Sequence, residues 1–285
     1  MYGSYCNIAD LKGVLGITAT TDDVTIRKIV EASSRSIDQY TNRTFIAYSG
    51  TKYFNGAREL WIPDLLSINA SGLKTDDNDD GTYENTWATT DYIEYGIGIE
   101  DTLNTYPRIR LETNPNGDYN SFASGVKKGV QIIGLWGYGD GISATPYVLD
   151  TTLTAAITSL TALTCAVTAV ANLSAGNTIL IDTEQMYIYS IATLTLTVER
   201  SVNGTDAATH LINAPLYIYQ YPSDIRQACI DLSTALYQLR DKKGVQSEKI
   251  GDYSYTLTNV TALGRKSLIE SILDDGIRSY KRMRF

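Results

Sequence analysis

The sequence predicts a mixed α+β fold, with helices near both ends of the chain and β-structure between them. Three observations support this prediction. Apolar residues recur at helical spacing in residues 7–40 and again after residue 223. Short runs of alternating polarity, separated by Gly, Asn and Asp, fill residues 45–140. Residues 143–221 are rich in Thr, Ala and Ile, carry few charges and contain further alternating runs.

Two helices are predicted in the first forty residues. Asn7 and Asp10 have the spacing of a capping box before the first helix, and Gly16 is suited to end it. Thr20 and Asp23 have the same spacing before the second helix. The predicted apolar stripes are Ile8, Leu11, Val14 and Leu15 in the first helix, and Ile26, Ile29, Val30, Ile37 and Tyr40 in the second.

Residues 45–140 are expected to form a compact β module. Asn55 and Gly56 are a tight-turn signal, and Pro63 is expected to end a strand because proline has no backbone N–H to donate. The expected strands are residues 51–56, 59–62, 65–73, 83–95, 108–112 and 129–138, with turns at 76–81 and 114–118.

Residues 143–221 are expected to form a small all-β domain, a sandwich or a barrel. Its expected strands are residues 161–168, 179–181, 186–189 and 194–198, with turns at Gly176 and at Asn203-Gly204. The first part stays open between strand and helix, because the apolar residues at 153, 157, 160 and 163 also fit a helical period.

Helical spacing returns after Pro222. Ser223 is the predicted N-cap of a helix that ends before Gly244, and a last helix follows. The apolar stripes are Ile225, Ala228, Cys229, Leu232, Leu236 and Leu239, and then Leu268, Ile269, Ile272 and Leu273. We therefore expect the terminal helices to pack together with the small β module as one core, residues 1–142 and 222–285, into which residues 143–221 are inserted.

The composition restricts the classes of function. A net charge of −8 argues against strong non-specific DNA binding, which needs clustered cations. The abundance of tyrosine, 21 residues against 4 Phe and 3 Trp, favours half-buried strands and wet interfaces. Three scattered cysteines argue against a disulfide framework and for a reducing compartment. The chain starts without a signal-peptide pattern, and no stretch is apolar enough to be expected to span a membrane.

No pattern in the chain indicates catalysis. The loop Asp76–Gly81 resembles the first half of a calcium-binding loop, but Trp87 stands where a bidentate carboxylate is required, so a solvated turn is favoured. His210 is the single histidine, which excludes a multi-histidine zinc site, and no nucleophile elbow accompanies it. We expect no catalytic residues, no metal ion and no cofactor.

Both ends of the chain resemble the head–tail connector (adaptor) family of tailed phages. The similarity is carried by residues 8–17, 22–23 and 29–33, and by Ile37-Asp-Gln-Tyr-Thr-Asn-Arg-Thr-Phe45. In the middle it is carried by residues 76–83, Asp91-Tyr92, Tyr106-Pro107 and Gly134–Gly139, and at the end by Pro222–Cys229 and Gly244–Ser254. The resemblance covers about two-thirds of the chain, and the order of these segments is its most specific feature.

The resemblance implies a structural subunit of a ring, usually twelve-fold, that sits under the portal protein and leaves a channel through which DNA passes without specific binding. It implies a place in the virion neck, after assembly in the host cytoplasm. The resemblance assigns portal binding to the basic tail, Arg278, Lys281, Arg282, Arg284 and Phe285. From its composition alone, the same tail could equally be a solvated end. Contacts between neighbouring copies are expected at Arg35, Asp38, Arg43, Asp224, Arg226, Lys249 and Asp252, and near the turn at Asp79.

Residues 143–221 depart from the family pattern, because small adaptors continue almost directly into the helix at Pro222. This segment resembles a β module found in several phage structural proteins. It is expected to project from the ring and either to hold fibre, collar or tail proteins or to stabilise the fold. Three alternatives remain: a stopper or tail-completion protein of the neck, a carbohydrate-binding β module and, last, an enzyme.

Overall fold

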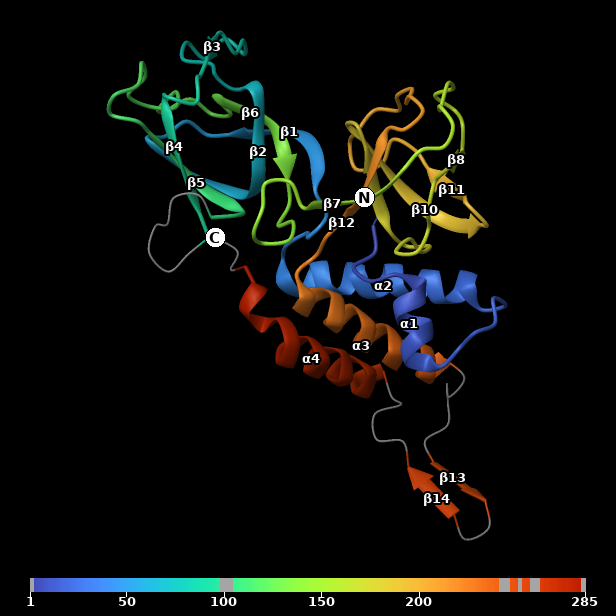
Figure 1. The fold of residues 1–285 in the computed structure, drawn as a ribbon. Coiled ribbons are helices and arrows are strands. Elements are labelled where there is room, and N and C mark those ends of the chain that lie inside the picture. The colour runs from blue at the N-terminus through green and yellow to red at the C-terminus, as the bar shows by residue number, and fades with distance from the viewer. Residues whose placement is uncertain (1–2, 98–104, 241–246, 251–252, 257–261, 283–285) are drawn as a thin grey trace.

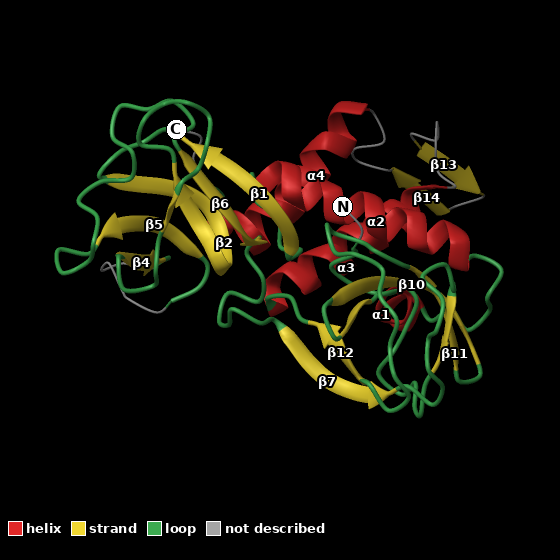
Figure 2. Ribbon diagram, turned by 90° about the horizontal axis from the view of Figure 1, so that it is seen from above, coloured by secondary structure: helices red, strands yellow, loops and turns green. Residues whose placement is uncertain are grey.

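The computed structural model describes residues 3–97, 105–240, 247–250, 253–256 and 262–282, and it confirms the mixed α+β prediction. Figure 1 shows two β units side by side on one side of a layer of helices, and Figure 2 shows the same pair from above. The helices are α1 (Ile8–Leu15), α2 (Asp23–Thr41), α3 (Ser223–Leu239) and α4 (Ala262–Ile277), followed by the 3₁₀ turn η2 (Arg278–Tyr280).

The helical layer is held together by a core to which all four helices contribute. Among its members are Leu11, Ile26, Val30, Ile37, Ile225, Leu232, Leu273 and Ile277, all nearly or fully buried. Ser33 of α2 and Ser233 of α3 are both buried, and their hydroxyl groups hydrogen-bond at 2.9 Å. Small side chains at this crossing allow the two helices to approach closely.

The helix ends follow the sequence prediction in part. The capping box of Asn7 and Asp10 is present, and Gly16 closes α1 in the left-handed conformation. Two other predicted caps are wrong, because α2 begins after Asp22 and α3 after Pro222, both without a side-chain cap. The predicted stripe of α1 is also wrong at Val14, whose side chain is 61% exposed.

The first β unit is an antiparallel sheet with the strand order β1-β6-β2-β5-β4, with β3 paired to one end of β2. Its apolar face includes Leu60, Ile62, Leu111, Ile132 and Trp136. The strands are β1 (Tyr48–Phe54), β2 (Glu59–Thr75), β3 (Asn85–Thr86), β4 (Tyr92–Gly96), β5 (Arg108–Thr113) and β6 (Val130–Trp136).

Three predictions for this sheet are wrong. Strand β2 continues through Pro63, because the ladder to β5 shifts register between Trp61 and Leu65 and requires no N–H there. The strand expected at 83–95 is divided into β3 and β4. The Asn55-Gly56 turn does not join a hairpin, because β1 pairs with β6 and not with β2.

The second β unit is a six-stranded antiparallel sheet in the order β7-β12-β9-β10-β11-β8. Backbone bonds from Thr154 N to Ala166 O (2.9 Å) and from Thr168 N to Thr152 O (3.0 Å) join its two edges, so the sheet closes into a barrel. Its own core lies inside. The strands are β7 (Tyr147–Thr152), β8 (Thr164–Ala166), β9 (Thr178–Ile181), β10 (Glu184–Ala192), β11 (Thr195–Glu199) and β12 (Pro215–Tyr219).

Residues 153–163 contain no helix, so the helical alternative is wrong, and the strand expected at 161–168 is confined to β8. Leu153 and Ile157 instead form single β-bridges to Val167 and His210. Strands β7 and β12, which begin and end the unit, are neighbours with Tyr147 opposite Tyr219. The chain therefore enters and leaves the barrel at one place.

A two-stranded ribbon, β13 (Ser247–Ile250) and β14 (Tyr253–Thr256), lies on the other side of the helical layer from the two β units (Figure 1). An isolated two-stranded ribbon has marginal stability in water. This position makes the ribbon a candidate for contact with another molecule.

Candidate interaction surfaces

The predicted portal arm is attached to the rest of the chain as far as Arg282. Arg282 donates from its backbone N to the carbonyl oxygen of Thr41 at 2.8 Å and from Nη2 to that of Ile62 at 2.7 Å. Lys281 lies over the ring of Tyr40, 4.7 Å from its centre. Arg278 is exposed on η2, whereas Arg284 and Phe285 lie outside the described residues.

Arg43 is one of the residues that hold this tail. Its guanidinium forms an ion pair with Asp64 of β2 and donates to the carbonyl oxygen of Tyr280 at 2.7 Å. The side chains of Arg43 and Asp64 are 9% and 6% exposed. Arg43 and Phe45 of the family-like segment thus make their contacts within this chain, and Phe45 is fully buried beside Tyr280.

Arg35 and Asp38 also have partners within the chain. They form an ion pair with 3.0 Å between Nη1 and Oδ2, and Asp38 accepts a hydrogen bond from the hydroxyl of the buried Tyr5. Burial raises the pKa of Asp38 to about 6, although Arg35 and the Tyr5 hydroxyl act in the opposite direction. Arg35 remains partly exposed and also donates from Nη2 to the carbonyl oxygen of Gly3 at 3.1 Å.

Asp224 and Arg226 are exposed in the first turns of α3. Arg226 forms an ion pair of 2.6 Å with Asp10 of α1. Lys249 lies in β13 opposite Ser254, and Asp252 is outside the described residues.

Two grooves, which sequence reasoning missed, run along the two flanks of α3. The first, here called the basic groove, lies between α2 and the last turns of α3 and has Lys28 and Arg240 beside Ile29, Leu236 and Leu239. Arg240 also pairs with Asp22 at 2.9 Å, whereas Lys28 has no ion-pair partner among the residues that the structure describes.

The second, the acidic groove, lies between the first half of α3 and α4 and has a volume of about 460 Å³. Asp224, Asp231 and Asp275 line it around Ala228 and Ile272. All three carboxylates are exposed, and within the described part of the chain none forms an ion pair. Two surfaces of opposite charge therefore lie at opposite ends of α3. The seven-residue spacing of Asp224 and Asp231 is the sequence signal that could have indicated one shared face.

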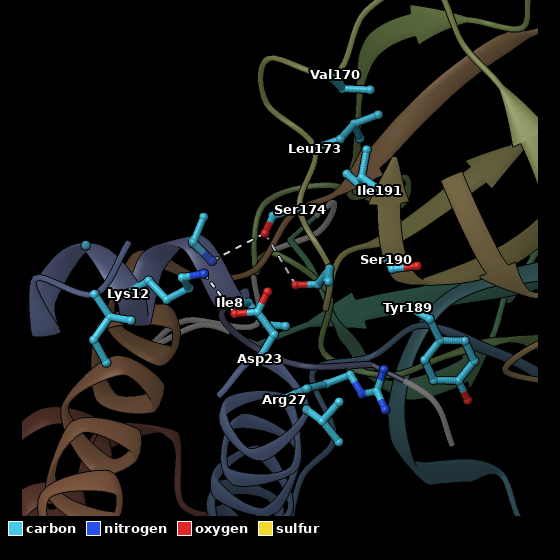
Figure 3. A pocket seen from close by; sticks show the side chains of 15 residues that line it. Ile8, Lys12, Asp23, Arg27, Val170, Leu173, Ser174, Tyr189, Ser190 and Ile191 are labelled. Carbon is cyan, nitrogen blue, oxygen red and sulfur yellow. Dashed lines mark hydrogen bonds and ion pairs between the residues drawn. The ribbon is translucent and has the colours of Figure 1, made fainter. Parts of the chain in front are cut away.

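A cleft of about 620 Å³ marks the seam between the barrel and helices α1 and α2 (Figure 3). Its charged groups have partners, since Lys12 Nζ lies 2.8 Å from Asp23 Oδ1 and Arg27 covers the ring of Tyr189. Ser174 accepts a hydrogen bond from the backbone N of Ala9. The contacts of Ser174 with Ala9 and of Tyr189 with Arg27 attach the barrel to the helices. Apolar side chains such as Leu173 and Ile191 line the rest of the cleft.

A buried polar cluster inside the barrel contains the single histidine. His210 Nε2 lies 2.9 Å from Glu184 Oε2, and Arg200 forms a bidentate ion pair with the same carboxylate. Burial alone would raise the pKa of Glu184, but hydrogen bonds from Arg200, Ala208, His210 and Ser201 lower it to about 2. Glu184 is fully buried, so the cluster holds the loops of the barrel together rather than facing a substrate.

The acidic loop is organised by its own backbone. Asp76, 4% exposed, accepts hydrogen bonds from Asp80 N (3.3 Å) and Gly81 N (2.8 Å). One oxygen each of Asp76, Asp80 and Glu84 lies within 4.8 Å of the others. Trp87, at the twelfth position, is buried in a stack with Phe122, so it belongs to the core. Hydrogen bonds of this kind, from backbone N–H groups to an aspartate side chain, stabilise a turn, and they explain the conformation of the loop.

No protein-family model matches this chain, and no curated protein sequence matches it significantly. Among the described residues, no helix combines the length and the apolar character needed to cross a membrane.

Proposed function

We propose that this chain is a structural subunit of a tailed-phage neck, a head–tail adaptor that forms a ring beneath the portal protein, and that it is not an enzyme. The observation that carries the proposal is the pair of unlike grooves at opposite ends of α3. A ring requires two different, complementary surfaces on every copy, so that each subunit binds the next head to tail until the set closes.

The occupant of each groove in this proposal is a second copy of the chain. The exposed carboxylates of the acidic groove face Lys28 and Arg240 of the neighbour, and Ile272 meets Ile29, Leu236 and Leu239. Apolar contact supplies affinity, and charge complementarity selects the orientation. The resemblance of the terminal segments to adaptors supports the same reading. The ribbon β13–β14 and the residues after Arg282 are the parts proposed to reach the portal.

The barrel, residues 143–221, is proposed to be an insertion in the adaptor core. Its first and last strands are neighbours, and its apolar core is its own. In a ring it would be carried on the same side of the helical layer as the sheet β1–β6. There it is available to stopper, tail, fibre or collar proteins.

The test is electron microscopy of the chain mixed with the portal protein encoded beside it. Solution mass alone is insufficient, because a portal can template a ring that does not form without it. An added ring under the portal is the expected result. A bare portal would overturn the adaptor proposal and favour a stopper, a tail-completion protein or a carbohydrate-binding module, which glycan-array binding would distinguish.

Charge exchange tests the interface itself. Asp231→Lys and Lys28→Glu should each abolish the ring, and the double variant should restore it, because each interface then again joins opposite charges. Asp206→Lys and Lys127→Glu change charges that are also exposed but lie outside both grooves, and they should leave the ring intact. If all four single variants behave alike, the grooves are not the interface.

A further inference from the structure

Two cysteines far apart in the sequence meet inside the helical layer. The Sγ atoms of Cys6 and Cys229 are 3.3 Å apart and joined by a hydrogen bond. Cys6 is in the segment before α1, and Cys229 is in the middle of α3. They are 4% and 0% exposed. Both are free thiols, at a separation from which a small movement forms a disulfide, whose S–S length is about 2.05 Å.

The surroundings of the pair differ on its two sides. Cys6 lies on the wall of a cleft of about 590 Å³ that is open to solvent beside Asn7 and Arg226. Cys229 lies behind it, with Ser34 Oγ 3.5 Å from its sulfur. A small reagent can therefore reach Cys6 first.

The acidities of the two thiols also differ. The hydrogen bond to Cys229, followed by burial, raises the pKa of Cys6. Burial would raise the pKa of Cys229 too, but hydrogen bonds from Cys6, Ser34 and Ser233 lower it. The first proton that the pair loses therefore leaves its negative charge on Cys229.

We propose that Cys6 and Cys229 are an oxidative modification site, which hydrogen peroxide converts to an intramolecular disulfide. Cys6 passes its proton to the Cys229 thiolate along their hydrogen bond, and the Cys6 thiolate attacks one peroxide oxygen. The O–O bond breaks, and the hydroxide that leaves takes the proton back from Cys229, so that a sulfenic acid, one water and the Cys229 thiolate form. The Cys229 thiolate then attacks the sulfur of the sulfenic acid, and the S–O bond breaks. The hydroxide takes up the proton that the pair released and leaves as a second water. Two thiols and one peroxide thus give one disulfide and two waters, with two electrons passing from sulfur to oxygen.

The new bond would close a loop between positions separated by 223 residues. The bond would link α3 covalently to the segment before α1, which includes the buried Tyr5. The backbone N of Tyr5 already donates a hydrogen bond to Ser34. A cross-link over so long a loop restricts the unfolded chain strongly. If the chain is a virion subunit, the pair stays reduced during assembly and closes after release. That timing rests on the proposed function, but formation of the bond does not, so each can fail without the other.

The experiment uses the full chain carrying Cys165→Ser, which leaves the pair as its only thiols. Thiols are counted in denaturant before and after hydrogen peroxide, and peptides are mapped by mass spectrometry without reduction. We expect the count to fall from two to none, a peptide joining Cys6 to Cys229, and a Tm raised by at least about 5 °C that reductant reverses.

The matched controls are Cys6→Ser and Cys229→Ser in the same background, each checked for native circular dichroism. After the same treatment neither should form an intramolecular cross-link or show a rise in Tm, because each lacks one of the two sulfurs. Two remaining thiols, cross-links mainly between chains, or an oxidised protein with a lower Tm would each overturn the proposal. Because this measurement needs no portal protein, a missing ring does not affect it.

Discussion

Arg282 reaches back from the C-terminal segment to Asp64 in β2, with its Nη1 3.5 Å from the carboxylate. Asp64 is buried and also forms an ion pair with Arg43. One buried carboxylate therefore holds two cations, one from the end of the helix hairpin and one from the tail. The basic tail thus helps to close the fold as far as Arg282.

Asp64→Ala should lower the free energy of unfolding by about 3 kcal/mol, because it leaves the nearly buried Arg43 without its anion. Urea denaturation measures the change. Lys281→Ala, which removes an exposed cation from the same tail, should cost less than about 1 kcal/mol. Equal losses in the two variants would show that Asp64 does not anchor the tail.

Glu184→Gln should destabilise the barrel by about 3 kcal/mol, because Arg200 then keeps a buried charge without a counter-ion. Asp182→Asn is the matched control. Asp182 contacts the other nitrogen of His210 at 2.7 Å, but its side chain is 52% exposed, so its loss should cost less than about 1 kcal/mol. Thermal unfolding of both variants measures the difference, and the prediction fails if the control is the less stable.

Glu184 and Asp38 should have opposite effects on the pH dependence of stability. The pKa of Glu184 is lowered from 4.5 to about 2, so its contribution is complete above pH 4.5 and is lost as the pH falls towards 2. The pKa of Asp38 is raised from 3.8 to about 6, so its contribution is complete below pH 3.8 and is lost as the pH rises through 6.

Unfolding free energies measured between pH 2 and 7 check both signs. Glu184→Gln should flatten the rise in stability between about pH 2 and 4.5, and Asp38→Asn should flatten the fall between about pH 4 and 6. Curves that run parallel to that of the wild type would contradict both assignments.

Gly204→Ala should disturb the contact between the barrel and β1. A Cβ at Gly204 would lie 2.2 Å from the carbonyl oxygen of Ser49, next to the bond from Ser49 N to Asn203 O. Gly125→Ala is the control, because Gly125 also has positive φ but has no atom within 4 Å of the added Cβ.

Both variants share the cost of about 1 kcal/mol for alanine at positive φ, and the excess in Gly204→Ala reports the clash. We expect that excess to be at least about 1 kcal/mol. Proteases should also cleave residues 139–146, which connect β6 to the barrel, faster than in the wild type, because a weakened barrel contact exposes this connection. If both variants lose the same stability, Gly204 is required only for its backbone angle.

The sequence by itself determined the features that depend on neighbours within a few residues. The capping box of Asn7 and Asp10 and the stop at Gly16 are made within a single helix, so their spacing is sufficient to predict them. Alternation of polarity is likewise local, which is why strands such as β5 and β6 were predicted nearly in place.

Tertiary structure decided the rest, because several residues have partners that spacing does not reveal. Asp22 and Asp23 begin α2, but Tyr237 and Arg240 bond to Asp22, and Lys12 pairs with Asp23, so no capping box forms. Arg282 meets Asp64, and Cys6 meets Cys229, across more than 200 residues. Both grooves exist because α2 and α4 pack on the two flanks of α3. A long-range contact is set by the packing of whole elements, which no local pattern in this chain encodes.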